Sequence, residues 1–217
     1  MEFRLLGPLE IVEHGRVLEL GSARQRALLV VLLLHANEVV SVDRLIDELW
    51  GRSPPATAGK ILQVYVSRLR KELGDGRLVT RAPGYVLRAD RSELDFARFE
   101  QLMAESDIAD PLQAASRLRR ALALSRGPPL ADMEYEPFAQ AEIARLEELQ
   151  WTALERRIDA DLAAGRHAEV IGELEALIAA HPLRERPRGQ LMLALYRSGR
   201  QAEALEAYRR ARQELSE

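Results

Sequence analysis

Hydrophobic and polar positions repeat with a period of two at the start of the chain and with a longer period afterwards. Apolar residues alternate with polar ones over 3–5, 9–11 and 17–20, which predicts three short strands joined by turns. Beyond these strands, apolar residues recur at intervals of three and four, which predicts a helix from Ser22 to about residue 36 and a second over 41–49. The chain is therefore predicted to open with a small antiparallel sheet followed by amphipathic helices.

A third helix, predicted over 56–73, has the clearest division into two faces. Pro55 suits the first turn of a helix, and Gly74 suits its end. The apolar residues fall on one face, and they are Ile61, Leu62, Tyr65, Val66, Leu69 and Leu73. The opposite face and its flanks carry Lys60, Gln63, Val64, Ser67, Arg68, Arg70 and Lys71. Because the stretch 60–81 holds six basic and two acidic residues, this outer face is locally basic.

The residues that follow this helix predict a β-hairpin with an arginine at its tip. The stretches 78–80 and 85–87 flank the turn residues 81–84, which read Arg-Ala-Pro-Gly. Three helices followed by such a hairpin predict a winged helix, in which one helix enters the major groove of DNA and the hairpin reaches the backbone or the minor groove.

The outer face of the third helix offers side chains that suit contacts with DNA. Lysine and arginine can bind phosphates or guanine edges, Gln63 can pair with adenine, and Val64 or Thr57 can touch a thymine methyl group. A basic helix face is more often simply solvated, so this pattern alone is weak. The hairpin with Arg81, placed directly after the helix, strengthens the DNA-binding interpretation.

The composition changes near residue 95 and indicates two domains, 1–92 and 93–217. Eleven of the 12 valines lie before residue 95, and 24 of the 31 alanines lie after it. Valine favours strands and alanine favours helices, so the first domain can hold sheet and the second should be helical. The predicted fold class is an α+β winged helix followed by an all-α tetratricopeptide-like domain.

Two segments of the second domain match at an offset of 34 residues, which is the tetratricopeptide period. Residues 165–171 repeat as 199–205, so Gly165 and Gly199 are expected in the turn of each helix pair. The matching apolar positions are Leu174 with Tyr208 and Leu177 with Ala211.

The residues before this repeat predict further helices. An earlier pair is predicted over 94–105 and 112–125, followed by a non-helical insert over 127–136 and a long helix over 138–163. The order gives about seven helices in a right-handed stack.

Six motifs occur in order along the first domain, at 6–9, 21–29, 45–51, 54–55, 65–71 and 83–87. Together they resemble the DNA-binding half of the actinomycete antibiotic regulatory proteins, whose winged helix is similar to that of OmpR-type response regulators. The resemblance implies a transcriptional activator that binds direct repeats in promoters, with its protomers arranged head to tail.

The resemblance also implies which residues contact DNA. The recognition helix would use Thr57, Lys60, Gln63, Val64, Ser67, Arg68 and Lys71, to which the helical periodicity adds Arg70. The wing would use Arg81, Gly84 and Tyr85. Arg24 and Arg26, at the start of the first helix, fall where contacts with the DNA backbone or with polymerase are expected.

Motifs at 136–139, 146–149, 181–185 and 191–200 resemble the bacterial transcriptional activator domain of the same regulators. One departure is that the sequence stops at 215–217, where the family usually continues with a short segment, as in a shortened chain or the front of a longer regulator. The resemblance implies double-stranded DNA and RNA polymerase holoenzyme as partners, a homodimer on DNA, and antibiotic biosynthesis genes as targets.

Two other functions use the same features. The winged helix could bind protein within a helical-repeat adaptor, and a repressor would make the same DNA contacts as an activator. The second domain could also be a scaffold without sequence-specific contacts.

Signals for an enzyme are weak. The four histidines are scattered without ligand spacing, and Gly59-Lys60 lacks the glycines of a phosphate-binding loop. We therefore expect no catalytic residue, no cofactor and no metal.

The chain has no cysteine, a net charge of −3 and no apolar run longer than eight residues. These features predict a cytoplasmic protein without membrane contact. The resemblance to DNA-binding regulators implies that it is associated with the nucleoid.

Overall fold

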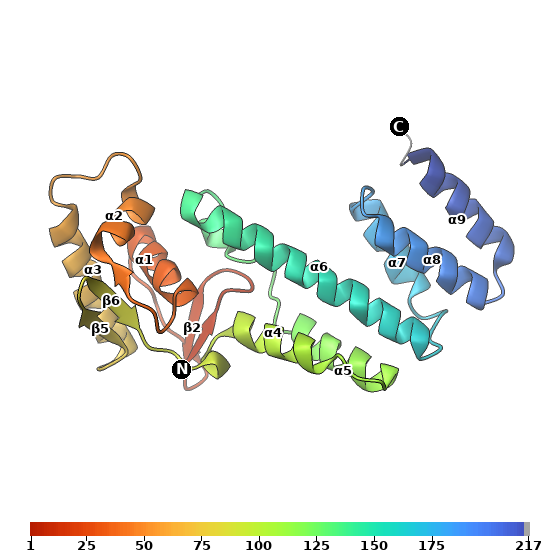
Figure 1. Cartoon of the computed structure of the whole chain (residues 1–217), viewed down its shortest axis with the longest axis horizontal. Helices are drawn as coiled ribbons and strands as arrows, with labels where there is room; N and C mark the ends of the chain where they lie inside the picture. The colour runs from red at the N-terminus through yellow and green to blue at the C-terminus, as the bar shows by residue number, and fades with distance from the viewer. Residues whose placement is uncertain (215–217) are drawn as a thin grey trace. The chain divides into compact units, whose positions relative to one another are not determined.

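The computed structural model describes residues 1–214 and divides into two compact units (Figure 1). Unit 1 consists of Met1–Phe99 and Leu124–Glu147, and unit 2 consists of Glu100–Ala123 and the chain from Glu148 onward. The predicted departure from the family at 215–217 lies outside the described residues. No helix in the described part of the chain is both long and apolar enough to cross a membrane.

The first 87 residues of unit 1 form two small antiparallel sheets and three α-helices, as expected for a winged helix. The first sheet has the order β1-β2-β3 and the second has the order β4-β6-β5. Its elements are β1 (Glu2–Arg4), β2 (Glu10–Glu13), β3 (Arg16–Val17), α1 (Ala23–Leu34), β4 (Val40–Ser41), α2 (Val42–Trp50), α3 (Ala58–Leu73), β5 (Leu78–Arg81) and β6 (Gly84–Leu87). The Ser22 hydroxyl accepts from the Gln25 N–H at 3.4 Å, so the predicted cap of α1 is confirmed.

Strand β4 was not predicted, and it explains why the wing needs a glycine. Val40 pairs with Tyr85 and Ser41 pairs with Gly84, so β4 adds a third strand to the hairpin. A Cβ atom at Gly84 would lie 1.8 Å from the carbonyl oxygen of Val40. Because no side chain fits in that space, the close approach of β4 and β6 requires glycine.

The segment before α6 completes the core of unit 1. Leu130, Met133 and Ala139 are buried in the same apolar cluster as residues of β1, α1 and α3. The Leu130 N–H donates to the Leu5 carbonyl at 2.9 Å, and the Asp132 carboxylate accepts from the Leu9 N–H at 2.9 Å. The compact units therefore do not follow the predicted boundary at residue 92. The predicted non-helical insert also holds two short 3₁₀ helices, η2 (Ala131–Met133) and η3 (Pro137–Ala139).

Asp95 joins the start of the chain to the end of the winged helix. Its carboxylate is buried and accepts from the N–H groups of Leu5 and Leu6 at 2.8–2.9 Å. Burial raises the pKa of Asp95, and the hydrogen bonds from these amides act in the opposite direction. Residues beyond the predicted domain boundary thus hold the end of β1.

The helices that follow the winged helix supply unit 2. Two of them, α4 and α6, begin in unit 1 and end in unit 2. They are α4 (Asp95–Glu105), α5 (Pro111–Leu122), α6 (Gln140–Ala163), α7 (Ile171–Ala180), α8 (Glu185–Arg197) and α9 (Gln201–Glu214). Within the described residues there are thus six α-helices in this half, where about seven were predicted.

The two predicted repeat turns have the same geometry. Gly165 and Gly199 have φ angles of +82° and +79°, which suit glycine. Arg166 N–H donates to the Asp161 carbonyl, and Arg200 N–H donates to the Leu195 carbonyl, both at 2.9 Å. Each bond therefore closes the end of a helix in the same way, 34 residues apart, in agreement with the predicted repeat.

Candidate nucleic-acid interface

The outer face of α3 is an exposed row of polar and basic side chains. Leu62, Val66 and Leu69 bury the opposite face against the core of unit 1. The exposed row consists of Thr57, Lys60, Gln63, Val64, Ser67, Arg68 and Lys71. Among the described residues, no hydrogen bond or ion pair holds the side chains of Lys60, Gln63, Ser67, Arg68 or Lys71. These side chains are therefore free to bind an external ligand.

Arg70 lies on α3 but is held by the wing. Its Nε donates to the Leu78 carbonyl at 2.8 Å, and its Nη2 donates to the Thr80 hydroxyl at 2.7 Å. Its guanidinium also lies 5.9 Å from the centre of the Tyr85 ring. Arg70 thus fixes the hairpin beside α3 (Figure 1), a role that differs from the predicted contact with DNA.

The three residues predicted for the wing divide into one exposed and two buried positions. Arg81 is exposed at the tip of the hairpin, and no side-chain partner holds it within the described chain. Tyr85 is only 8% exposed, and Gly84 is buried against β4. The structure therefore leaves Arg81 as the accessible side chain and makes Gly84 and Tyr85 parts of the scaffold that positions it.

A shallow hollow of about 460 Å³ lies on the face of the hairpin that carries Val79, Arg81, Val86 and Arg88. Arg88 is not among the residues that were predicted to contact DNA. Alternation along β6 could have identified it, since residues 84, 86 and 88 share one face of a strand, and Arg81 pairs with Gly84. The exposed cations of the wing are thus Arg81 and Arg88, both on the same face.

Arg77 at the edge of this hollow is neutralised by Glu93. Its two guanidinium nitrogens donate to the Glu93 carboxylate at 2.9 and 2.7 Å. The hydrogen bond from Arg77 lowers the pKa of Glu93 from 4.5 to about 2, with further help from the Asp90 N–H. The pair joins the start of β5 to the turn before α4 and does not add to the free positive charge of the wing.

The Glu93→Gln variant is expected to lose stability at neutral pH and to lose less as the pH falls. A carboxyl group whose pKa is lower in the folded protein than in the unfolded chain stabilises the folded protein. This stabilisation is complete when the pH is above the pKa of the unfolded state, and it disappears as the pH falls through the pKa of the folded state. The gap in the free energy of unfolding between the two proteins should therefore narrow from about pH 4.5 towards about pH 2. Denaturant titrations at several pH values measure it, with the exposed Glu38→Gln as a control. If the difference in unfolding free energy between the two proteins stays constant over this pH range, the Arg77–Glu93 pair does not stabilise the fold as stated.

The two arginines at the start of α1 have partners within unit 1. Arg24 is exposed and lies 5.9 Å from the centre of the Trp50 ring. Arg26 forms an ion pair with Asp132 and so holds the segment before α6. Arg24 stays accessible for the predicted contact with DNA or polymerase, whereas Arg26 is engaged in the fold.

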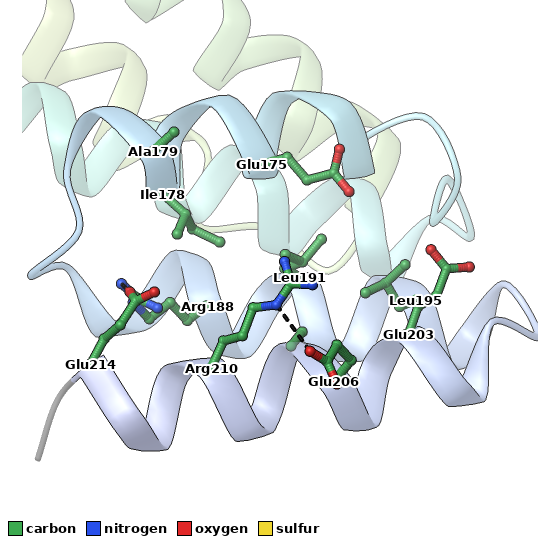
Figure 2. A pocket seen from close by; sticks show the side chains of 11 residues that line it. Glu175, Ile178, Ala179, Arg188, Leu191, Leu195, Glu203, Glu206, Arg210 and Glu214 are labelled. Carbon is green, nitrogen blue, oxygen red and sulfur yellow. Dashed lines mark hydrogen bonds and ion pairs between the residues drawn. The ribbon is translucent and has the colours of Figure 1, made fainter.

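Unit 2 has a groove of a different chemical character. It measures about 420 Å³ and lies between α7 and α9 with α8 as its floor (Figure 2). The groove is lined by four glutamates and two arginines, and the arginines are paired: Arg188 with Glu214 at 2.5 Å and Arg210 with Glu206 at 3.2 Å. This lining does not suit a phosphate backbone, whereas the exposed row on α3 of unit 1 carries cations without partners.

Comparison with known proteins covers nearly the whole chain. Residues 94–217 match the family model described as bacterial transcriptional activator domain, and residues 15–87 match the one described as transcriptional regulatory protein, C terminal. The regulatory protein AfsR of Streptomyces griseus is 44% identical over 100% of this chain and 23% of its own length. The regulatory protein DnrI of Streptomyces peucetius is 38% identical over 99% of this chain and 85% of its own length.

A solved structure has the same fold. Mycobacterium tuberculosis EmbR, in complex with a low-affinity phosphopeptide, superposes with a TM-score of 0.94 and 37% identity over 99% of this chain. The similarity covers 59% of the EmbR chain, and this chain spans less than a quarter of the AfsR relatives. The winged helix followed by the helical domain is thus shared with regulators that extend further.

Proposed function

Because the chain belongs to the family of actinomycete antibiotic regulatory proteins, we propose that it is a sequence-specific DNA-binding transcriptional activator. The observation that carries this proposal is the row of free basic and polar side chains on α3. Several arginines elsewhere are held by carboxylates, as Arg119 is by Asp161 at 2.5 Å and Arg184 by Glu148 at 2.6 Å. On α3, by contrast, cations stand exposed with no partner of their own, as a phosphate contact requires.

In the proposed complex, α3 lies in the major groove and the wing follows the backbone. A helix of 16 residues is about 24 Å long, which exceeds the groove width of about 12 Å. Gln63 and Val64 would face base edges, with Lys60, Arg68 and Lys71 on guanines or phosphates. Arg70, Gly84 and Tyr85 act by fixing the wing beside this helix. The net charge of −3 does not oppose binding, since affinity depends on local positive surface.

The further steps of the proposal follow from the family. Two copies bind adjacent direct repeats in a promoter and recruit RNA polymerase holoenzyme, and the target genes serve antibiotic biosynthesis. No catalytic step, cofactor or metal is part of this function. A repressor would use the same DNA contacts, and the position of the binding site relative to the promoter separates the two.

The variant Arg81→Ala tests the role of the wing. Each lost phosphate contact lowers the slope of log affinity against log salt concentration by about one. We therefore expect weaker binding to all DNA sequences and a shallower salt dependence. Electrophoretic shifts at several salt concentrations measure both, with the exposed Arg120→Ala of unit 2 as a control of equal charge. An unchanged salt slope would remove the wing from the interface.

The same shift assay separates DNA binding from the adaptor alternative. Genomic fragments at moderate salt should be retarded by the 217-residue chain, and selection from random DNA should yield a consistent site. If no fragment shifts at low or moderate salt, the proposed function is wrong and the adaptor alternative is favoured.

A further inference from the structure

Helix α3, the proposed recognition helix, carries one acidic residue among its cations. The acidic residue is Glu72, and the cations are Lys60, Arg68, Arg70 and Lys71. A carboxylate on this helix repels DNA phosphates, and it can also neutralise a neighbouring cation. Arg68 precedes Glu72 by four residues, so the two side chains lie on the same side of the helix. Glu72 would therefore oppose the proposed binding unless its carboxylate were held away from the outer face of α3.

A buried glutamine of α1 holds this carboxylate. The Gln25 side chain is fully buried, and its amide nitrogen donates to the two carboxylate oxygens of Glu72 at 2.9 and 2.8 Å. Within the described residues, this contact is the one side-chain link by hydrogen bonds between α1 and α3. Arg68, one turn from Glu72, forms no hydrogen bond or ion pair in the described part of the chain. Gln25 thus holds the Glu72 carboxylate towards α1 and leaves Arg68 free.

The side chain of Gln25 does not fulfil the local role that the sequence offers it. Gln25 stands three residues after the Ser22 cap, and in a capping box its side chain would accept a hydrogen bond from the Ser22 N–H. The Oε1 atom, which is the acceptor for such a bond, has no partner within the described chain. The Gln25 side chain therefore serves the contact with α3 and not the cap of its own helix.

Gly21 provides the space that this contact needs. A Cβ atom at Gly21 would lie 2.3 Å from Oε1 of Gln25 and 2.9 Å from its amide carbon. The φ angle of Gly21 lies outside the left-handed region, so its backbone does not itself require glycine. A side chain at this position would push the Gln25 amide away from Glu72. The glycine is thus explained by the contact between α1 and α3.

We propose that Gln25 is a positioning residue for DNA binding, which holds the Glu72 carboxylate and so keeps Arg68 free and the outer face of α3 positive. This inference rests on the proposed function, because it assigns a role within the same interface. A neutral donor suits the role. An acidic residue at position 25 would repel Glu72, and an apolar residue would leave the carboxylate free to turn towards Arg68.

The variant Gln25→Ala tests this role together with its rescue by Glu72→Gln. Loss of the amide should release the Glu72 carboxylate towards Arg68. Losing one phosphate contact lowers the slope of log affinity against log salt concentration by about one, and at moderate salt it weakens binding about three- to tenfold. The double variant Gln25→Ala, Glu72→Gln has no carboxylate at this place, so it should recover the affinity and the salt slope of the unchanged chain. Electrophoretic shifts on the selected DNA site at several salt concentrations measure both.

Gly21→Ala reaches the same contact without removing a buried group. Its methyl group should displace the Gln25 amide, because the two would otherwise overlap. Binding should therefore weaken as in Gln25→Ala, and it should recover when Glu72→Gln is added. This second pair of variants gives the same comparison if Gln25→Ala does not fold, which circular dichroism shows.

Two matched controls in unit 2 separate this effect from a general loss of stability. Gln190→Ala removes another buried glutamine whose amide donates to a carboxylate, that of Asp159 at 2.6 Å. Gly172→Ala adds a methyl group that would have no heavy atom within 4 Å. Both controls should leave the DNA affinity and the salt slope unchanged, whatever they do to the melting temperature.

Each outcome decides the proposal. Recovery of affinity and salt slope on removal of the Glu72 carboxylate supports it. A folded Gln25→Ala variant that binds like the unchanged chain overturns it. A double variant that binds as weakly as Gln25→Ala alone also overturns it, because Gln25 would then support only the packing of α3. If the unchanged chain shifts no DNA, the proposed function and this inference both fail. If it shifts DNA and the variants do not follow the expected pattern, the inference alone fails.

Discussion

Replacing Lys60 and Arg68 together with alanine is expected to weaken binding to a selected DNA site about tenfold or more. Both side chains are exposed on α3 and have no partner in the described chain, so their removal costs the fold little. On DNA each would bind a phosphate or a guanine edge, and a good base contact contributes about 1–3 kcal/mol of discrimination. Two such losses correspond to at least a tenfold fall in affinity.

The matched control removes the same charge elsewhere. Arg16 and Arg120 are exposed, and the double variant Arg16→Ala, Arg120→Ala also loses two positive charges. Titration of fluorescent DNA at fixed salt compares the two double variants. Equal affinities for both would show that net charge alone matters, and unchanged affinity of the α3 variant would exclude α3 as the recognition helix.

A fragment of residues 1–92 is expected to be largely unfolded, although it contains every strand and helix of the winged helix. It lacks Leu130 and Met133, which are buried in the core of unit 1. It also lacks Asp95, whose carboxylate holds the N–H groups of Leu5 and Leu6. Truncating one large buried side chain typically costs about 2–5 kcal/mol, and a whole domain is stable by only about 5–15 kcal/mol. The combined loss therefore approaches the total stability.

The fragment 1–147 is the matching control, because it retains all of unit 1. Thermal unfolding followed by circular dichroism should show a cooperative transition for 1–147 and none, or one at a much lower temperature, for 1–92. If both fragments melt at the same temperature, the segment before α6 contributes nothing to the stability of the winged helix.

The local features of the fold could be predicted from sequence because their causes are local. The periodicity and the Ser22 cap predicted α1, and the periodicity predicted the buried and exposed faces of α3. Strand β4 was missed because it has two residues and takes its partner from β6, more than 40 residues later. Sequence patterns report on residues that are close along the chain, whereas the paired residues of β4 and β6 are far apart in sequence.

The roles of some predicted site residues could not be predicted for the same reason, because contacts with residues far apart in sequence set them. Periodicity places Arg70 on the flank of α3, but its role is set by the carbonyl of Leu78 and the hydroxyl of Thr80. The motif containing Gly84 and Tyr85 was predicted at the wing correctly, yet pairing with β4 buries both residues. The place of the segment before α6 in unit 1 depends on the contact between Leu130 and Leu5, which no local pattern encodes.

The most direct test of the account asks whether the outer face of α3 lies in the major groove. The chain has no cysteine, so Ser67→Cys places a single thiol on this face, and an iron chelate attached to it cuts DNA nearby. We predict strong cutting within the selected site. The cuts on the two DNA strands should be displaced from each other in the direction that a probe in the major groove produces. The same chelate at His14→Cys, in the turn between β2 and β3, should cut weakly and without a fixed position. Equal cutting by both probes, or none from position 67 on bound DNA, would contradict the central claim.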